Sequence, residues 1–565
     1  MSARDLGLWL ARALSPSERD LSHEQTAREG AHLARELGAG ERAFSGAMAG
    51  RAHEQHLILG HADDGTSYRL ATGELGGIRL HLTGETGSGK TRVATNLADH
   101  VGARALAGDR VALKVADFKG GADGLADMTL RGHLGRIEQL PSRRQDDAFR
   151  KTLLFQPFGQ RITPWQMLAR TRSVSPLTQA AVTAEILGQM PGFGATGQLQ
   201  AELLQATIAT AVLEGWSLLE LRYALEEPDR LRDVMLRSPE PALRVYAATS
   251  LRRDLMTGTT ARGLTARLDV IRAVEEINAT FAGPEGIDIP SRCFGQGTVS
   301  IFDYSDPPEG AQRAMRALGA MAFVRLVWAI FDGNRDRSTS ALLITDEVQQ
   351  CLTPAVSDAV SRAITLGRSF GVGYVVAHQT VQQLPADLRS VMATSMSRMI
   401  GQGSREDAQL SVEFLPATGT VPRPRRPGEP FRWQHELLSE GEELRHRVAQ
   451  IRNLPRRHFV ISERGSTVPP LVIRAADFEP PAWADLDPGL VREFFASQGV
   501  DRDVAFARAR AIEEAAAARI VAANERGERE PAAAPRSRRR RAERFQTPDA
   551  VGEHDARERG AREVP

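Results

Sequence analysis

A phosphate-binding loop is indicated by eight consecutive residues: Gly84, Glu85, Thr86, Gly87, Ser88, Gly89, Lys90 and Thr91. They match the pattern G-x-x-x-x-G-K-[ST], in which glycines let backbone N–H groups curve around phosphates, the lysine reaches the β- and γ-phosphate oxygens, and the hydroxyl binds Mg²⁺. Only four of the 72 lysines and arginines are lysines, and a compact ammonium fits at this position of the loop, where a planar guanidinium would not. The loop therefore predicts binding of ATP or a related nucleoside triphosphate with Mg²⁺.

The segments on either side favour this interpretation over a Gly/Ser turn between two surface elements. An apolar strand is expected at residues 78–82, directly before the loop, and an amphipathic helix from about residue 90 to residue 100, directly after it. Strand, loop and helix in this order form the setting that a phosphate-binding loop requires.

An acidic pair, Asp346 and Glu347, ends the apolar segment 341–345 and supplies the second half of a hydrolytic site. Hydrolysis of a nucleoside triphosphate needs a carboxylate near the metal and a group that orients the attacking water. We assign the metal to Asp346, together with the Thr91 hydroxyl, and the water to Glu347. Acidic residues also suit the start of a helix, but the phosphate loop in the same chain favours the metal interpretation.

Three further polar residues are candidates for the same chemistry. Gln379 follows the apolar strand expected at 372–377, where its amide could contact the γ-phosphate or the attacking water as a sensor. Arg368 precedes that strand and Arg398 lies in the segment 395–400; either could reach the γ-phosphate of a neighbouring subunit as an arginine finger. Because the chain is rich in arginine, a purely structural role competes with this one for both.

The pattern of strands and helices predicts an α/β fold interrupted by an all-α insertion. Strands alternate with helices twice, and helical spacing without strand signals separates the two stretches. The expected segments are an N-terminal helical segment at 1–60, the first part of the α/β domain at 61–164, the all-α insertion at 165–285, the second part of the α/β domain at 286–480, a helical segment at 481–525 and a disordered basic tail at 526–565.

Composition restricts the class of protein. The net charge of +1 gives no global indication of nucleic-acid binding, so any basic surface must come from local runs such as 423–427 and 536–541. The two cysteines provide neither a disulfide framework nor the spacing of metal ligands. No apolar run approaches eighteen residues and no secretion signal is evident, so we expect a cytoplasmic protein without an integral membrane segment.

With these motifs in place, the chain resembles the FtsK/HerA-type P-loop ATPases, and among them the TraG/TraD-type conjugative coupling proteins of type IV secretion, over about residues 55–480. Residues 57–65 are similar to the family's LGxxxDG segment, and the phosphate loop is similar to GxTGSGKT. Residues 117–121 resemble the D-x-K-G element, in a form also similar to that of type VII protein-secretion ATPases. The acidic pair, Arg368 and Gln379 then follow in the family's order.

The resemblance implies a RecA-like parallel sheet flanked by helices, a homo-hexameric ring with ATP sites between subunits, and DNA in its channel. The implied function is an ATP-hydrolysing DNA translocase of conjugative DNA transfer or DNA processing, working with a relaxase, a nuclease or a secretion-channel protein. Coupling proteins usually carry N-terminal membrane helices, which are not seen here, so attachment to the inner membrane would be peripheral, through a partner. Two alternatives stay open: a protein-secretion motor, and a nucleotide-gated scaffold for a nuclease or relaxase.

Overall fold

A computed structural model describes residues 42–44, 56–189, 197–251, 259–282, 287–305, 307–413, 415–416, 420–422, 435–437, 439–465 and 470–529. Most of the expected N-terminal helical segment, the arginines Arg423, Arg425 and Arg426, and the arginine run at 536–541 lie outside these residues. The chain divides into two units, Met1–Ala516 and Ala517–Pro565, and the first of these holds the sheet described below.

Seven neighbouring parallel strands form the centre of a 12-stranded sheet. In spatial order they are β11 (Ser397–Ile400), β4 (Arg79–Thr83), β10 (Val372–His378), β9 (Ser340–Asp346), β5 (Val111–Asp117), β8 (Val299–Asp303) and β6 (Thr152–Phe155). Strands β4, β5, β9 and β10 are almost fully buried, which explains their continuous apolar sequences, because a parallel sheet is covered on both faces. The expected parallel sheet is confirmed.

The sheet continues beyond β11 as a largely antiparallel extension that the sequence did not predict. It consists of β14 (His458–Ser462), β15 (Leu471–Ala475), β2 (His56–His61), β3 (Ser67–Ala71) and β1 (Arg42–Phe44). The expectation of helix up to residue 60 is therefore wrong for residues 42–44, which form β1, and for residues 56–60, which form most of β2. The apolar run at 56–60 is too short to show a helical period, and pairing with β3 and β15 decides its conformation.

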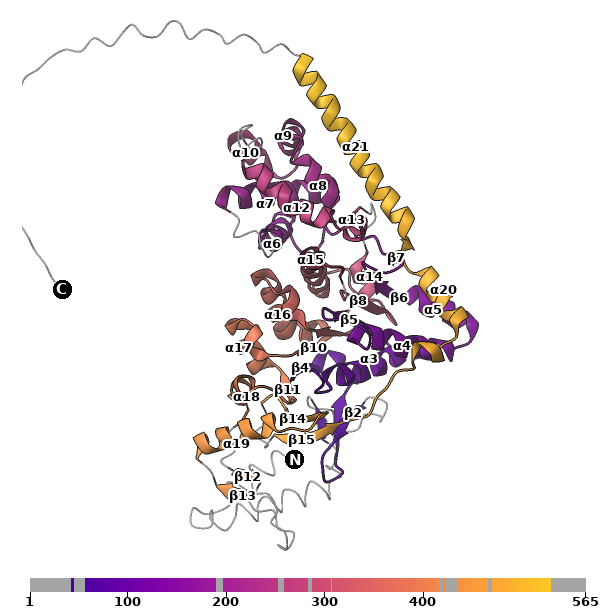
Figure 1. The fold of residues 1–565 in the computed structure, drawn as a ribbon, viewed down its shortest axis with the longest axis vertical. Coiled ribbons are helices and arrows are strands. Elements are labelled where there is room, and N and C mark those ends of the chain that lie inside the picture. Colours follow the sequence, from indigo (N-terminus) through magenta and orange to yellow (C-terminus); the bar gives the residue numbers. More distant parts are fainter. Residues whose placement is uncertain are drawn as a thin grey trace, which may run out of the picture. The chain divides into compact units, whose positions relative to one another are not determined.

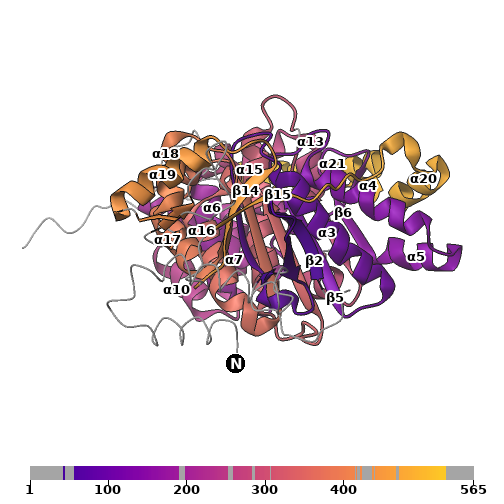
Figure 2. The same cartoon turned by 90° about the horizontal axis from the view of Figure 1, so that it is seen from below.

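Helices cover both faces of the parallel strands, as Figures 1 and 2 show. Helices α3 (Lys90–Ala107) and α4 (Leu125–Glu138) pack on one face, and α15 (Gln312–Ile330) and α16 (Pro354–Leu366) pack on the other. Successive side chains of β9 alternate between these two cores: Leu342 and Ile344 join the first, while Ala341 and Leu343 join the second. This alternation is the two-residue period of a strand buried between layers.

All the described elements between β7 (Arg161–Ile162) and β8 are helices. They are α6 (Pro176–Gly188), α7 (Gln198–Glu214), α8 (Leu218–Ala224), α9 (Pro228–Arg237), α10 (Pro241–Thr249), α12 (Thr259–Arg272), α13 (Glu275–Phe281) and α14 (Ile289–Phe294). Their buried side chains continue the core beneath α15. The last of these helices lies beyond residue 285, where we expected the insertion to end.

Six further helices are found in the described chain. They are α5 (Ser142–Lys151), α17 (Ala386–Ser395), α18 (Arg405–Val412), α19 (Glu440–Arg452), α20 (Pro488–Ser497) and α21 (Arg502–Arg529). Because α21 continues to Arg529, residues 526–529 are helical and not part of a disordered tail. Within the described ranges, no helix combines the length and the apolar character that crossing a bilayer needs.

Candidate functional site

The phosphate-loop octet connects β4 to α3 at the carboxyl edge of the parallel strands. Three of its glycines have positive φ: Gly84 (144°), Gly87 (85°) and Gly89 (102°). The ammonium of Lys90, the first residue of α3, donates to the carbonyl oxygens of Gly84 at 2.5 Å and Glu85 at 3.1 Å. Burial lowers the pKa of Lys90, while the carboxylates of Asp346 and Glu347 oppose that shift. An anion bound here would meet a buried cation and the unpaired amides of a helix start.

Strand register brings Asp346 to the phosphate loop. It lies at the end of β9, opposite Asp117 on β5 and Ala377 on β10. The Thr91 hydroxyl donates to Asp346 Oδ2 at 3.4 Å, while Asp346 Oδ1 is buried without a hydrogen-bond partner in the described structure. Burial, followed by the charges of Asp117 and Glu347, raises the pKa of Asp346 to about 7. A hydroxyl, an unsatisfied carboxylate oxygen and an adjacent anion site fit a cation such as Mg²⁺, which uses few protein ligands and substrate phosphates.

Glu347 lies directly beyond the strand in a left-handed conformation, with φ 57° and ψ 40°. A non-glycine residue in this region is uncommon and is often found at functional sites. Its N–H donates to Ala377 O at 2.8 Å, and its carboxylate accepts a hydrogen bond from the Gln349 amide. The side chain is buried, and Glu347 Oε1 has no partner among the described residues. The backbone thus places an unsatisfied carboxylate oxygen directly after Asp346.

Gln379 follows the last residue of β10 at the same edge of the sheet, and its side chain is partly buried. Two buried histidines, which we did not predict as site residues, support its backbone. His378 Nδ1 lies 3.1 Å from Thr380 O, and His378 Nε2 lies 2.5 Å from His81 Nε2. Burial lowers the pKa of His378 to about 4, so the ring is neutral near pH 7. Both neighbours of Gln379 are therefore tied in place.

A third carboxylate, Asp117 at the end of β5, shapes the loop that carries Lys119. It accepts backbone N–H groups from Lys119 at 3.0 Å, Gly120 at 2.9 Å and Ala126 at 3.0 Å. These bonds fold the loop so that Lys119 lines the same cavity as Lys90. The sequence signal for this loop was the D-x-K-G element, but we had not assigned Lys119 to the site.

Of the residues described above, Lys90, Thr91, Lys119, Asp346 and Glu347 line a cavity of about 380 Å³. The predicted sensor Gln379, the two histidines and Asp117 do not line it. Its lining comprises Thr86, Gly87, Gly89, Lys90, Thr91, Arg92, Lys119, Asp123, Met128, Asp346, Glu347, Arg456, Arg457 and Glu479. The two arginines Arg456 and Arg457 come from the turn before β14 and belong to no motif, so no signal in the sequence identified them.

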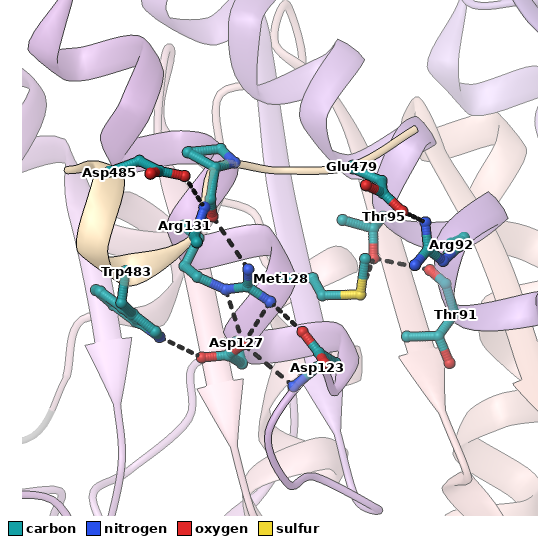
Figure 3. A network of polar contacts seen from close by, with 12 residues as sticks. Thr91, Arg92, Thr95, Asp123, Asp127, Met128, Arg131, Glu479, Trp483 and Asp485 are labelled. Atoms are coloured by element: carbon teal, nitrogen blue, oxygen red, sulfur yellow. Dashed lines mark hydrogen bonds and ion pairs between the residues drawn. The ribbon is translucent and has the colours of Figure 1, made fainter. Parts of the chain in front are cut away.

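The segment after β15 lines this cavity with Glu479, and Figure 3 shows the polar contacts that the segment makes. Glu479 pairs with Arg92 on α3. Further along, Trp483 Nε1 donates to Asp127 Oδ1 on α4 at 2.8 Å, and Arg131 Nη1 donates to Pro481 O at 3.0 Å. These contacts join the segment after β15 to both α3 and α4.

The two candidate finger arginines are not brought to this cavity. Arg368 is exposed in the turn η4 (Gly367–Phe370), before the first residue of β10 and so at the opposite edge of the sheet from Gln379. Arg398 is buried in β11, where its guanidinium donates to Ala393 O at the end of α17. Burial lowers the pKa of Arg398 to about 10.

No protein-family model and no curated protein sequence matches the chain. Several solved structures resemble it. A trigonal form of the bacterial conjugative coupling protein TrwB is 18% identical, with 78% of this chain and 93% of that chain covered and a TM-score of 0.48. VirB4 of Thermoanaerobacter pseudethanolicus is 13% identical, with 76% and 98% covered and a TM-score of 0.42. The cytoplasmic domain of the type VII secretion ATPase EccC of Thermomonospora curvata is 14% identical, with 80% and 32% covered and a TM-score of 0.30.

The coupling protein and the type VII secretion ATPase belong by name to the two classes that the sequence motifs resemble. TrwB has also been solved in complex with ADP and Mg²⁺ and with a non-hydrolysable ATP analogue. Because every TM-score given above is below 0.5, the fold of this chain is established by its own strand order: seven parallel strands, helices on both faces, and a phosphate loop at their carboxyl edge.

Proposed function

We propose that the chain is an ATP hydrolase that uses Mg²⁺. The observation that carries the proposal is the meeting of Thr91 and Asp346, residues 255 positions apart in the chain, beside the buried ammonium of Lys90. Lys90 and the loop amides would hold the phosphates, and Thr91 and Asp346 would hold the metal. When bound, Mg²⁺ neutralises charge on the phosphate oxygens. Glu347 would orient and polarise the attacking water, and Gln379 would sense the γ-phosphate.

Two substitutions separate these roles. Lys90→Ala removes the cation that binds the phosphates, so it should weaken ATP binding itself. Glu347→Gln keeps the shape of the side chain but removes the water-polarising carboxylate, so it should bind ATP like the parent and hydrolyse it about 10²- to 10⁴-fold more slowly. Binding is measured with a fluorescent ATP analogue and turnover by phosphate release. Equal loss of ATP affinity in both variants would contradict the assignment.

We further propose that hydrolysis drives movement of DNA through a homo-hexameric ring. Support comes from the order of the motifs, which resembles that of coupling proteins, and from the helical insertion between β7 and β8. The exposed position of Arg368 suits a finger that acts on a neighbouring subunit, whereas Arg398 is turned into its own chain. DNA of any sequence should then stimulate ATP turnover, and the stimulation should fall steeply with salt, because such contacts are made to phosphates.

The ring and the finger are tested together by mixing inactive subunits. In a ring, Lys90→Ala subunits can supply Arg368 to the intact phosphate loop of Arg368→Ala subunits, so the mixture should recover part of the activity. A size measurement with and without ATP and DNA verifies assembly. A monomer under all conditions would refute the ring, and mixed rings without recovered activity would leave Arg368 structural.

The second candidate is a protein-secretion motor, favoured by residues 117–121, whose form resembles that of type VII secretion ATPases. Under that proposal, ATP turnover would respond to a secreted polypeptide and not to DNA. A nucleotide-gated scaffold for a nuclease or relaxase would instead bind ATP, change its assembly state and turn over slowly. Turnover measured with DNA, with polypeptide and with neither distinguishes the three.

A further inference from the structure

Arg457 is held directly over the phosphate loop by its backbone. Its N–H donates to Ser88 O at 3.0 Å, and its carbonyl oxygen accepts the N–H of Ala475 at 2.8 Å. Its φ is 65°, one of three positive values among the described non-glycine residues. An arginine in this conformation is held there by its surroundings, and here those surroundings are the loop and the β14–β15 pair.

The side chain of Arg457 packs against the loop and faces the cavity. A Cβ built on Gly89 would lie 3.3 Å from Arg457 Cγ, so the close approach depends on the glycine. The side chain is 29% exposed and lines the cavity. Its Nε is buried without a hydrogen-bond partner in the described structure. The guanidinium pairs with Asp477, a carboxylate that is 66% exposed and also lies 3.3 Å from Arg474. An ion pair to so exposed a carboxylate is weak, so a phosphate in the cavity could replace it.

The position along the loop indicates which phosphates Arg457 would reach. Asp346, at the metal end of the cavity, accepts a hydrogen bond from the Thr91 hydroxyl. Arg457 lies instead beside Gly89, at the start of α3, where loop amides in proteins of this pattern cradle the α- and β-phosphates.

We propose that Arg457 is a nucleotide-binding residue that contacts the α- and β-phosphates of the nucleotide bound to its own chain. The inference rests on the proposed ATPase function and adds the Arg457 guanidinium to the cations that bind the nucleotide. Since ADP and ATP share these two phosphates, Arg457 binds both equally well. Such uniform binding lowers KM without accelerating the chemical step.

The test measures ADP and ATP affinities of the full chain with Mg²⁺ for the parent, Arg457→Gln and Arg474→Gln. A charge-assisted hydrogen bond in a cavity corresponds to about 10- to 100-fold in affinity. We expect Arg457→Gln to weaken ADP and ATP binding by this factor, equally for both nucleotides, and to raise KM while kcat at saturating ATP stays within about threefold. Arg474→Gln is the matched control, because it removes a cation from the same Asp477 but does not line the cavity. It should bind both nucleotides like the parent.

Unchanged ADP and ATP affinities in Arg457→Gln would overturn the inference. So would a fall in kcat at unchanged KM, which would place the guanidinium at the γ-phosphate, or equal losses in both variants, which would place the effect in Asp477. Should Arg457→Gln fail to fold, Arg457→Asn gives the same measurement, since asparagine tolerates this φ. A parent chain that binds no nucleotide would instead refute the proposed function.

Discussion

Two adjacent glycines in the loop that carries Lys119 allow a direct test of how that loop is built. Gly120 and Gly121 have φ values of 64° and 94°. A Cβ built on Gly120 would lie 1.4 Å from Ser305 Cβ and 2.4 Å from Ser305 Cα, whereas a Cβ on Gly121 would meet nothing within 4 Å. The substitutions Gly120→Ala and Gly121→Ala therefore add the same methyl group to the same loop, with a collision in one case only.

Backbone conformation alone predicts the opposite order of destabilisation to the one we expect for these two substitutions. A left-handed conformation costs an alanine about 1–2 kcal/mol. The φ of Gly120, 64°, lies inside that region and the φ of Gly121, 94°, lies outside it, so by this criterion Gly121→Ala would destabilise the fold more than Gly120→Ala. The collision with Ser305 adds about 1–3 kcal/mol for overpacking. We therefore expect Gly120→Ala to lose about 2–5 kcal/mol of unfolding free energy, more than Gly121→Ala.

The assay is urea unfolding of the full chain followed by circular dichroism, together with ATP turnover. Relief of the collision must move the loop away from Ser305 and with it Lys119, so Gly120→Ala should also lose ATP turnover. If Gly121→Ala is as destabilising as Gly120→Ala or more so, backbone conformation and not the contact with Ser305 decides the loop, and the reasoning fails.

Three further predictions concern other parts of the chain. His133 is fully buried, and burial lowers its pKa to about 4, so as the pH falls from about 6.5 to 4 only the unfolded chain protonates this histidine. Relative to His133→Gln, the parent should therefore lose about 2 kcal/mol of unfolding free energy between pH 7.5 and pH 5. A difference between the two proteins that does not change with pH would contradict this. The carboxylate of Glu443 accepts from Arg447 Nε at 2.9 Å in a buried ion pair, so Arg447→Met should cost about 3–5 kcal/mol in urea unfolding, with much of the loss recovered in Glu443→Leu/Arg447→Met; equal losses in the single and double variants would show that packing dominates. Deletion of 531–565, which contains the arginine run, should leave basal ATP turnover unchanged and flatten the dependence of DNA affinity on log salt by up to about one unit for each DNA phosphate that the segment binds; an unchanged slope would show that this segment does not touch DNA.

Local sequence was sufficient where the chemistry depends on a short segment. The strand, loop and helix at the phosphate loop could be predicted because the glycines, Lys90 and Thr91 lie within eight consecutive residues, between an apolar and an amphipathic segment. The parallel strands could be predicted because strands buried on both faces have continuous apolar sequences. The position of Asp346 at the carboxyl edge of the sheet could be predicted by the same rule, since this residue ends such a strand.

Only the tertiary structure decided which distant residues share the cavity. Arg457 lies 367 residues after Lys90 in sequence, in a turn without a motif, and reaches the phosphate loop because β14 pairs with β11 beside β4. The sequence offered Arg398 and Arg368 equally as arginine fingers. In the structure, Arg398 is buried and donates to Ala393 O, whereas Arg368 is exposed just before β10 begins. The physical reason is the same in each case: strand pairing and burial depend on the whole sheet, and hydrogen bonds between segments far apart in the chain leave no periodic pattern in either of them.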